Sequence, residues 1–242
     1  MKLIPVGLAF IVILAITSSA NADVFFTETF DDSSGFTTST PFFSDDDVST
    51  GDDFFGLGGT ADDWGGDSTP SGLKAYTGFV GGILTGMDLD GEGASLPVTV
   101  DWTGIDITGR TGLEFAGDFA EFFDAPGDID ATDQLFVEAQ IDGGGYVTIL
   151  EFTPGAFTSG DSVNGFFFND GVQLGNAAQN FTGAIAGTGT TLDLRLTINL
   201  NAGDEDFGAD NFTLRSDAVP EPGSMVVLGL VGLTGLLSRR RR

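Results

Sequence analysis

The sequence predicts an all-β protein built on one β-sandwich of the jelly-roll kind. Between residues 23 and 218 no long apolar stretch repeats with the helical period, and many short alternating segments are separated by Gly, Asp, Asn and Ser. About nine such segments fall within these 196 residues, which suits one sandwich better than two domains. We expect a signal peptide over residues 1–22 and a hydrophobic helix within residues 219–242.

The clearest strand is Thr191–Leu200, where five leucine or isoleucine side chains alternate with polar ones. This alternation predicts one face on the core and the other in water. A hairpin is expected from Gln134–Ile141 and Tyr146–Phe152, because the glycines of the joining loop can adopt positive φ. Further strands are expected at Val24–Phe30, Gly78–Thr85, Ser95–Trp102, Gly112–Ala120, Phe166–Phe168 and Asn211–Arg215.

The segment Asp31–Gly72 interrupts this pattern. It is rich in Asp, Ser, Thr and Gly, with Phe42, Phe43, Phe54, Phe55 and Trp64 between them. We expect a long loop region there, with at most one short strand.

The polar composition excludes several classes of enzyme and partner. Without His or Cys the chain cannot form a Ser-His-Asp or Cys-His nucleophile, an imidazole or thiolate zinc site, or a disulfide. The formal charge of −27 means that nucleic acid would be repelled. Residues 23–218 keep four bases and 35 acids, a net charge of −31 that divalent cations or salt would relieve.

The N-terminus has the three parts of a secretory signal peptide. A basic Met1-Lys2 start precedes an apolar run over Leu3–Ile16, and an Ala-x-Ala cleavage signature ends at Ala22. The alternative is an uncleaved anchor helix, but that requires roughly 20 apolar residues. We therefore expect removal of residues 1–22 and export through the inner membrane.

The C-terminus combines a proline motif, an apolar stretch and a basic end. The apolar stretch over Met225–Leu237 is short for a permanent anchor, so an ordinary tail anchor is the weaker alternative. Arginines at the end hold such a helix with its basic side inside. The motif is Val219, Pro220, Glu221 and Pro222, and the membrane stop is Arg239, Arg240, Arg241 and Arg242.

These three parts resemble the PEP-CTERM sorting signal of Gram-negative bacteria, over Val219–Arg242. The resemblance implies an exosortase-type membrane enzyme as partner, with transient membrane insertion through the C-terminal helix. It also implies delivery to the cell envelope or extracellular matrix of an exopolysaccharide producer. It implies no enzymatic activity.

The domain also resembles the concanavalin-like and carbohydrate-module jelly rolls of secreted bacterial proteins. The resemblance rests on the opening at Glu28–Asp31, the Asp-Gly-Gly-Gly-Tyr hairpin and the closing segment Asn201–Phe212. It implies that Glu28 and Asp210 lie side by side and hold a structural calcium ion, with Asp31 and Glu205 as further ligands. The alternative is that these acids end strands and face water.

Two further segments resemble parts of calcium loops. The acids of Asp88–Gly93 alternate around Gly91, and Asp128, Asp130 and Asp133 form a similar fragment. Neither has the later ligands of an EF-hand. Solvated turns are the alternative in a chain this acidic.

For function we expect a structural or adhesive protein that contacts exopolysaccharide through bridging calcium. Trp64 is the best candidate for glycan contact, since Trp and Tyr rings suit wet sites, whereas Trp102 is expected in the core. The alternative is a carboxylate-based glycoside hydrolase on the same sandwich. Its candidate acids on or beside strands are Glu114, Glu121, Glu138 and Glu151.

Overall fold

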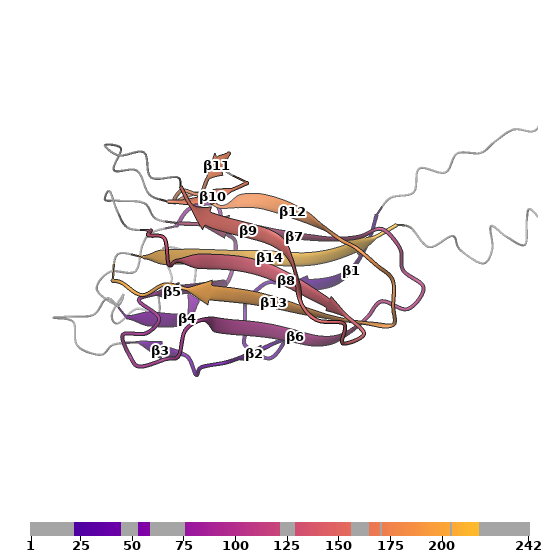
Figure 1. Cartoon of the computed structure of the whole chain (residues 1–242), viewed down its shortest axis with the longest axis horizontal. Helices are drawn as coiled ribbons and strands as arrows, with labels where there is room; N and C mark the ends of the chain where they lie inside the picture. The colour runs from indigo at the N-terminus through magenta and orange to yellow at the C-terminus, as the bar shows by residue number, and fades with distance from the viewer. Residues whose placement is uncertain are drawn as a thin grey trace, which may run out of the picture.

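Two antiparallel β-sheets face each other in the computed structural model (Figure 1). The structure describes residues 22–44, 53–58, 76–121, 129–155, 165–169, 171–203 and 205–217. These ranges contain strands, turns and loops but no helix, and therefore no apolar helix of membrane-spanning length. The predicted all-β sandwich is confirmed.

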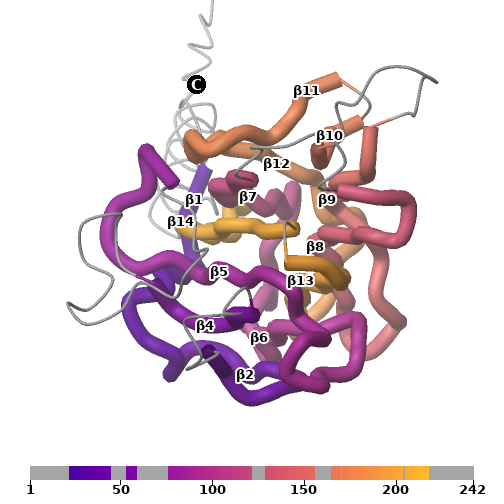
Figure 2. The backbone as a smooth tube through the Cα atoms, turned by 90° about the vertical axis from the view of Figure 1, so that its left-hand side faces the viewer, coloured from indigo at the N-terminus to yellow at the C-terminus, as the bar shows by residue number. Residues whose placement is uncertain are grey.

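Each sheet mixes strands from distant parts of the sequence. Figure 2 looks along the sandwich and shows the two layers side by side. The first sheet has the order β12 (Gln179–Ile185), β7 (Leu113–Ala120), β14 (Asp206–Ser216), β5 (Ile83–Met87), β4 (Phe54–Gly58) and β3 (Phe43–Ser44), and β1 (Asp23–Glu28) also pairs with β14. The second sheet has the order β11 (Val172–Gln173), β10 (Phe166–Phe168), β9 (Val147–Pro154), β8 (Gln134–Ile141), β13 (Thr191–Asn199), β6 (Val98–Asp106) and β2 (Thr37–Thr38).

The core between the sheets follows from strand alternation. The apolar side chains of β13 from Leu192 to Ile198 are fully buried, as the sequence predicts. Phenylalanine rings of the first sheet meet them, and Phe212 is the centre of this aromatic cluster, with its ring centroid 5.5 Å from that of Trp102 and 5.0 Å from that of Phe115. Trp102 is therefore a core residue, as expected.

The predicted hairpin is confirmed as β8 and β9. Its turn needs positive φ at Asp142 (48°), Gly143 (73°) and Gly145 (95°), which glycine adopts without steric cost. Asp142 fixes the turn by accepting hydrogen bonds from the backbone N–H groups of Thr190 (3.0 Å) and Thr191 (2.9 Å).

The expected loop over Asp31–Gly72 is wrong in its described parts, because three strands occur there. β4 has no polar residue, so its sequence Phe-Phe-Gly-Leu-Gly lacks the alternation used to recognise strands. It is nonetheless paired along its whole length with β5.

Several other strand boundaries also differ from the prediction. The strand expected at Gly78 begins at Ile83, because Gly78 and Gly81 have φ of 87° and 93°. The edge strand β12 was not expected, and the final strand begins at Asp206 rather than Asn211. The structure describes fourteen strands against about nine expected. The boundaries of the predicted segments 1–22, 23–218 and 219–242 stay predictions.

The two ends of the sandwich differ. At one end Asp23 pairs with Ser216, so the first and last strands meet there. At the other end three turns lie together. Two strand pairings bring them there, because Asp206 pairs with Met87 and Asn199 pairs with Gln134. Leu89 also donates its N–H to the carbonyl of Leu200 (3.0 Å). We call this second end the loop end; it comprises residues 88–93, 129–133 and 200–203 with 205.

Candidate functional site

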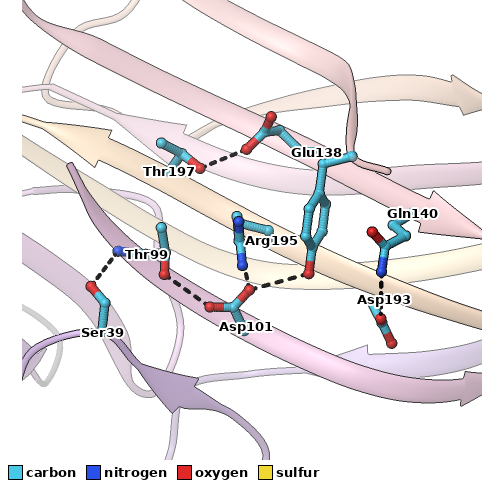
Figure 3. A network of polar contacts seen from close by, with 9 residues as sticks. Ser39, Thr99, Asp101, Glu138, Gln140, Asp193, Arg195 and Thr197 are labelled. Atoms are coloured by element: carbon cyan, nitrogen blue, oxygen red, sulfur yellow. Dashed lines mark hydrogen bonds and ion pairs between the residues drawn. The ribbon is translucent and has the colours of Figure 1, made fainter. Parts of the chain in front are cut away.

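A bonded group of polar side chains lies on the outer face of the second sheet (Figure 3). Asp101 Oδ1 accepts hydrogen bonds from Arg195 Nε (2.6 Å) and from the hydroxyl of Tyr146 (3.3 Å). Its other oxygen accepts one from the hydroxyl of Thr99 (2.9 Å). The Arg195 guanidinium carbon lies 4.0 Å from the centroid of the Tyr146 ring.

Strand register brings these residues together. Asp101 on β6 and Glu138 on β8 both pair with Arg195 on β13. In the next rows, the hydroxyl of Thr197 donates to Glu138 (2.7 Å), and the side-chain amide of Gln140 donates to Asp193 (3.1 Å). We call the set of Thr99, Asp101, Glu138, Gln140, Tyr146, Asp193, Arg195 and Thr197 the polar face.

The polar face is fixed but accessible. The side chains of Asp101 and Arg195 are 17% and 32% exposed, and Tyr146 is half-buried. Partial burial raises the pKa of Tyr146 above its ordinary value, so its hydroxyl remains a donor at neutral pH. The arrangement offers charged donors, carboxylate acceptors, an amide and one aromatic ring in fixed positions.

Glu28, expected as a calcium ligand, points into the core. Its two carboxylate oxygens accept hydrogen bonds from the indole N–H of Trp102 (3.0 Å) and the backbone N–H of Phe30 (2.8 Å). Glu28 is 9% exposed and pairs with the inward-facing Phe212. These contacts give the carboxylate a structural role as an acceptor for buried donors.

Asp210, the other expected ligand, lies on the outer face of the first sheet, opposite Asp118 of β7. A bulge with Asn211 at φ 54° reverses the alternation of β14 here, so Phe212 turns inward. Asp210 is fully buried, and this burial raises the pKa of its carboxyl to about 7. Hydrogen bonds from the backbone N–H groups of Asn211 and Val80 act in the opposite direction and lower the pKa. Glu28 and Asp210 therefore lie on opposite faces of the first sheet, so the expectation that they lie side by side is wrong. Calcium binding by either acid stays a prediction.

The loop end brings together acids that the sequence placed in separate fragments. Carboxylate oxygens of Asp130, Asp133 and Glu205 lie within 4.8 Å of one another, and neither Glu28 nor Asp210 belongs to such a group of three among the described residues. Burial raises the pKa of Glu205 to about 8, opposed by the backbone N–H of Asn201 and reinforced by the charge of Asp133. Burial likewise raises the pKa of Asp88 to about 7, with Asp53 and Asp90 adding to the shift.

The remaining predicted site residues divide into two sets. Asp31 is exposed and accepts the N–H of Gly82 (3.0 Å) rather than joining Glu205. Residues outside the described ranges include the signal peptide, Trp64, Asp128, the Val219–Pro222 motif and the Arg239–Arg242 cluster.

The carboxylates proposed for hydrolysis are dispersed. Glu121 is buried and accepts the N–H of Phe166 (2.6 Å), whereas Glu138 belongs to the polar face. Two surface hollows of about 410 and 250 Å³ are lined mainly by apolar side chains around Phe55 and Ile149, and no carboxylate lines either one.

Sequence reasoning did not select Asp101 or Arg195. They lie 94 residues apart, and only the register of β6 on β13 joins them. The available signal was the lone arginine among the outward positions of the clearest predicted strand.

Comparison with known families identifies the C-terminus. Residues 218–242 match the PEP-CTERM protein-sorting motif. The predicted sorting signal is thereby confirmed. The motif indicates a secreted, envelope-sorted protein of Gram-negative-type bacteria and implies processing by an exosortase. No curated protein matches the sequence.

Several solved structures are similar to the sandwich. The CBM22-1 xylan-binding domain of Paenibacillus barcinonensis Xyn10C has a TM-score of 0.38 and 12% identity, covering 84% of this chain and 100% of that one. The K3 cleaved adhesin domain of Porphyromonas gingivalis Lys-gingipain has a TM-score of 0.44 and 11% identity, covering 81% and 99%. The Stig cyclase Fisc of Fischerella sp. TAU has a TM-score of 0.46 and 14% identity, covering 83% and 100%. At these scores the similarities carry no inference about ligand or activity.

Proposed function

We propose that this is a non-enzymatic protein of the cell envelope or extracellular matrix, with a structural or adhesive role in contact with exopolysaccharide. The sorting motif at residues 218–242 carries the proposal, because it directs the chain to the surface. The sandwich supplies a folded domain for that location, and the polar face supplies groups that hydrogen-bond hydroxyl-rich polymers.

Calcium is proposed as the bridging ion. Segment 23–218 carries a net charge of −31, so the domain repels itself and any anionic polymer unless cations intervene. Carboxylates are also the ligand type that calcium prefers, and the chain has neither imidazole nor thiolate to favour another metal.

We propose, from where its carboxylates lie, that the protein has no catalytic activity. A glycoside hydrolase needs two carboxylates about 5–10 Å apart beside a substrate cleft. Two surface hollows in the described residues have apolar linings, and Glu121 is buried where it accepts the N–H of Phe166. Sugar release from the producing cell's polysaccharide that disappears in Glu-to-Gln variants would contradict this part of the proposal.

The decisive experiment is co-sedimentation of the mature protein with the producing cell's own polysaccharide, first in calcium and then in EDTA. We expect the protein in the pellet with calcium and a smaller pelleted fraction in EDTA. An equally anionic protein without a sorting motif serves as the control for trapping. Absence from the pellet in both buffers would contradict the polysaccharide-associated role while leaving the sorting unaffected.

A further inference from the structure

We propose that the polar face binds an uncharged, extended polysaccharide by direct hydrogen bonds, without a bridging cation. The inference rests on the proposed function, because it requires that the protein meets polysaccharide outside the cell. It adds the location of the contact and the chemical class of the sugar. Asp101, Tyr146 and Arg195 form its centre.

The first argument is the order of the hydrogen-bonding groups before any ligand arrives. Asp101 is held by Arg195, Tyr146 and Thr99, and Asp193 is held by Gln140 (3.1 Å) and by the N–H of Gly104 (2.8 Å). Side chains fixed in this way lose little rotamer entropy on binding. They also lie in cross-strand rows, and adjacent strands are spaced about 4.8 Å apart, a repeat close to the size of one sugar unit.

The second argument is the chemistry of the central ring. A sugar ring has an apolar C–H face surrounded by hydroxyls, and tyrosine combines an apolar ring with a polar edge. Tyr146 is held against Arg195 on one side and donates its hydroxyl to Asp101, which fixes the ring orientation. Arginine and carboxylate groups beside such a ring are suited to paired hydroxyls, because one donates and the other accepts.

The third argument is charge, which selects the class of polymer. The polar face carries the carboxylates of Asp101, Glu138 and Asp193 against the single guanidinium of Arg195. An anionic polymer would meet repulsion here as well as from the whole domain. A protein partner is disfavoured because stable protein interfaces have an apolar centre, whereas this centre is a bonded ion pair. Uncharged hydroxyls both donate and accept, so they are the complementary ligand.

The test is affinity gel electrophoresis of the full mature protein in EDTA, repeated in calcium. The gels contain hydroxyethyl cellulose, galactomannan or dextran as neutral probes, alginate as the anionic probe, or the producing cell's own polysaccharide. We expect retardation by at least one neutral polymer and none by alginate. Tyr146→Ala should weaken binding about tenfold, the loss of an aromatic contact of about 1.4 kcal/mol.

Two kinds of control keep this result interpretable. Tyr146→Phe keeps the ring and should retain most of the affinity. Arg195→Lys should lose it, because lysine has neither the Nε–H that bonds Asp101 nor the planar guanidinium that lies over Tyr146. Thr182→Ala, at an exposed position of β12 on the first sheet, should bind as the wild type does. Circular dichroism of each variant establishes that the fold is kept.

Four outcomes would overturn the inference. One is equal retardation of the wild type and Tyr146→Ala, and another is binding of alginate alone. The third is retardation by the cell's own polysaccharide only when calcium is present. The second and third would leave the proposed function standing. The fourth, no retardation by any polymer in EDTA or in calcium, would overturn both.

Discussion

The indole N–H of Trp102 donates a hydrogen bond to the carboxylate of Glu28 over 3.0 Å inside the sandwich. The bond joins β6 of the second sheet to β1 of the first, across the core. A buried acceptor in this position is needed because the indole and the Phe30 N–H have lost contact with water.

Glu28→Ala should therefore destabilise the fold. It leaves two buried donors without their acceptor, at about 1–3 kcal/mol each. Glu28→Gln keeps one carbonyl oxygen as an acceptor, so its loss of stability should be clearly smaller. Urea unfolding followed by tryptophan fluorescence measures both, and equal losses in the two variants would contradict the acceptor role.

The melting temperature should fall as pH rises from about 4 towards 8. Burial raises the folded-state pKa of Asp88 and Asp210 to about 7 and that of Glu205 to about 8. The native state then binds more protons than the unfolded chain in this window, and stability decreases with rising pH. Each 1 kcal/mol lost lowers the melting temperature by about 2–4 °C in a domain of this size.

The combined variant Asp88→Asn, Glu205→Gln should flatten this pH profile. Glu92→Gln changes an exposed acid of the same loop end and serves as the matched control. Scanning fluorimetry between pH 4.5 and 8.5 is sufficient for the comparison, in buffers prepared with EDTA. An unchanged slope in the combined variant would show that these acids do not set the profile.

Asp142 should produce the opposite pH dependence. The backbone N–H groups of Thr191 and Thr190 lower the pKa of its carboxyl to about 2. Its stabilising contribution is present above about pH 4 and is lost as pH falls through about 2. Asp142→Ala should be less stable at neutral pH and should lose less stability than the wild type on acidification. Amide exchange at Thr190 and Thr191 reports the change locally.

Calcium should raise the melting temperature at pH 8, measured against sodium chloride at equal ionic strength. The expected site at Glu28 and Asp210 predicts that the rise disappears in the variant Glu28→Ala, Asp210→Ala. A rise that survives there but disappears in Asp133→Asn, Glu205→Gln would locate the ion at the loop end instead. Magnesium is a useful second ion, because it demands a stricter geometry than calcium.

Mass spectrometry of the protein recovered from the producing cell should find neither residues 1–22 nor the hydrophobic segment Met225–Leu237. The variant Pro220→Ala, Pro222→Ala alters the sorting motif and should retain the C-terminal segment. A mature wild-type protein that still carries Met225–Arg242 would contradict tail processing.

Alternation was sufficient to predict the fold class and the strands that have one wet face, such as β13 and β8. It failed for β4, where both faces are buried and the residues are Phe, Gly and Leu. It also placed the start of β5 too early, because two glycines with positive φ shape the preceding segment.

The sites were harder to predict because they depend on register between distant strands. Asp130 and Asp133 are expected in a fragment of a calcium loop, and Glu205 is expected as a further ligand beside Glu28 and Asp210. Nothing in the sequence indicates that 129–133 and 205 meet. The reversal at Asn211 did have a signal, because the apolar residues of β14 change from odd positions (Phe207, Ala209) to even ones (Phe212, Leu214). The expected strand began only at Asn211, so this change was not used.

The pairing of Asp23 with Ser216 places the start of the first strand and the end of the last strand at one pole of the domain. The described chain enters the sandwich at residue 22 and leaves it at residue 217, both at this pole. β14 runs from that pole to the loop end over 11 residues. At the usual rise per residue the two ends of the sandwich are therefore roughly 35 Å apart. The acidic loop end therefore lies at the pole opposite both ends of the sandwich's chain.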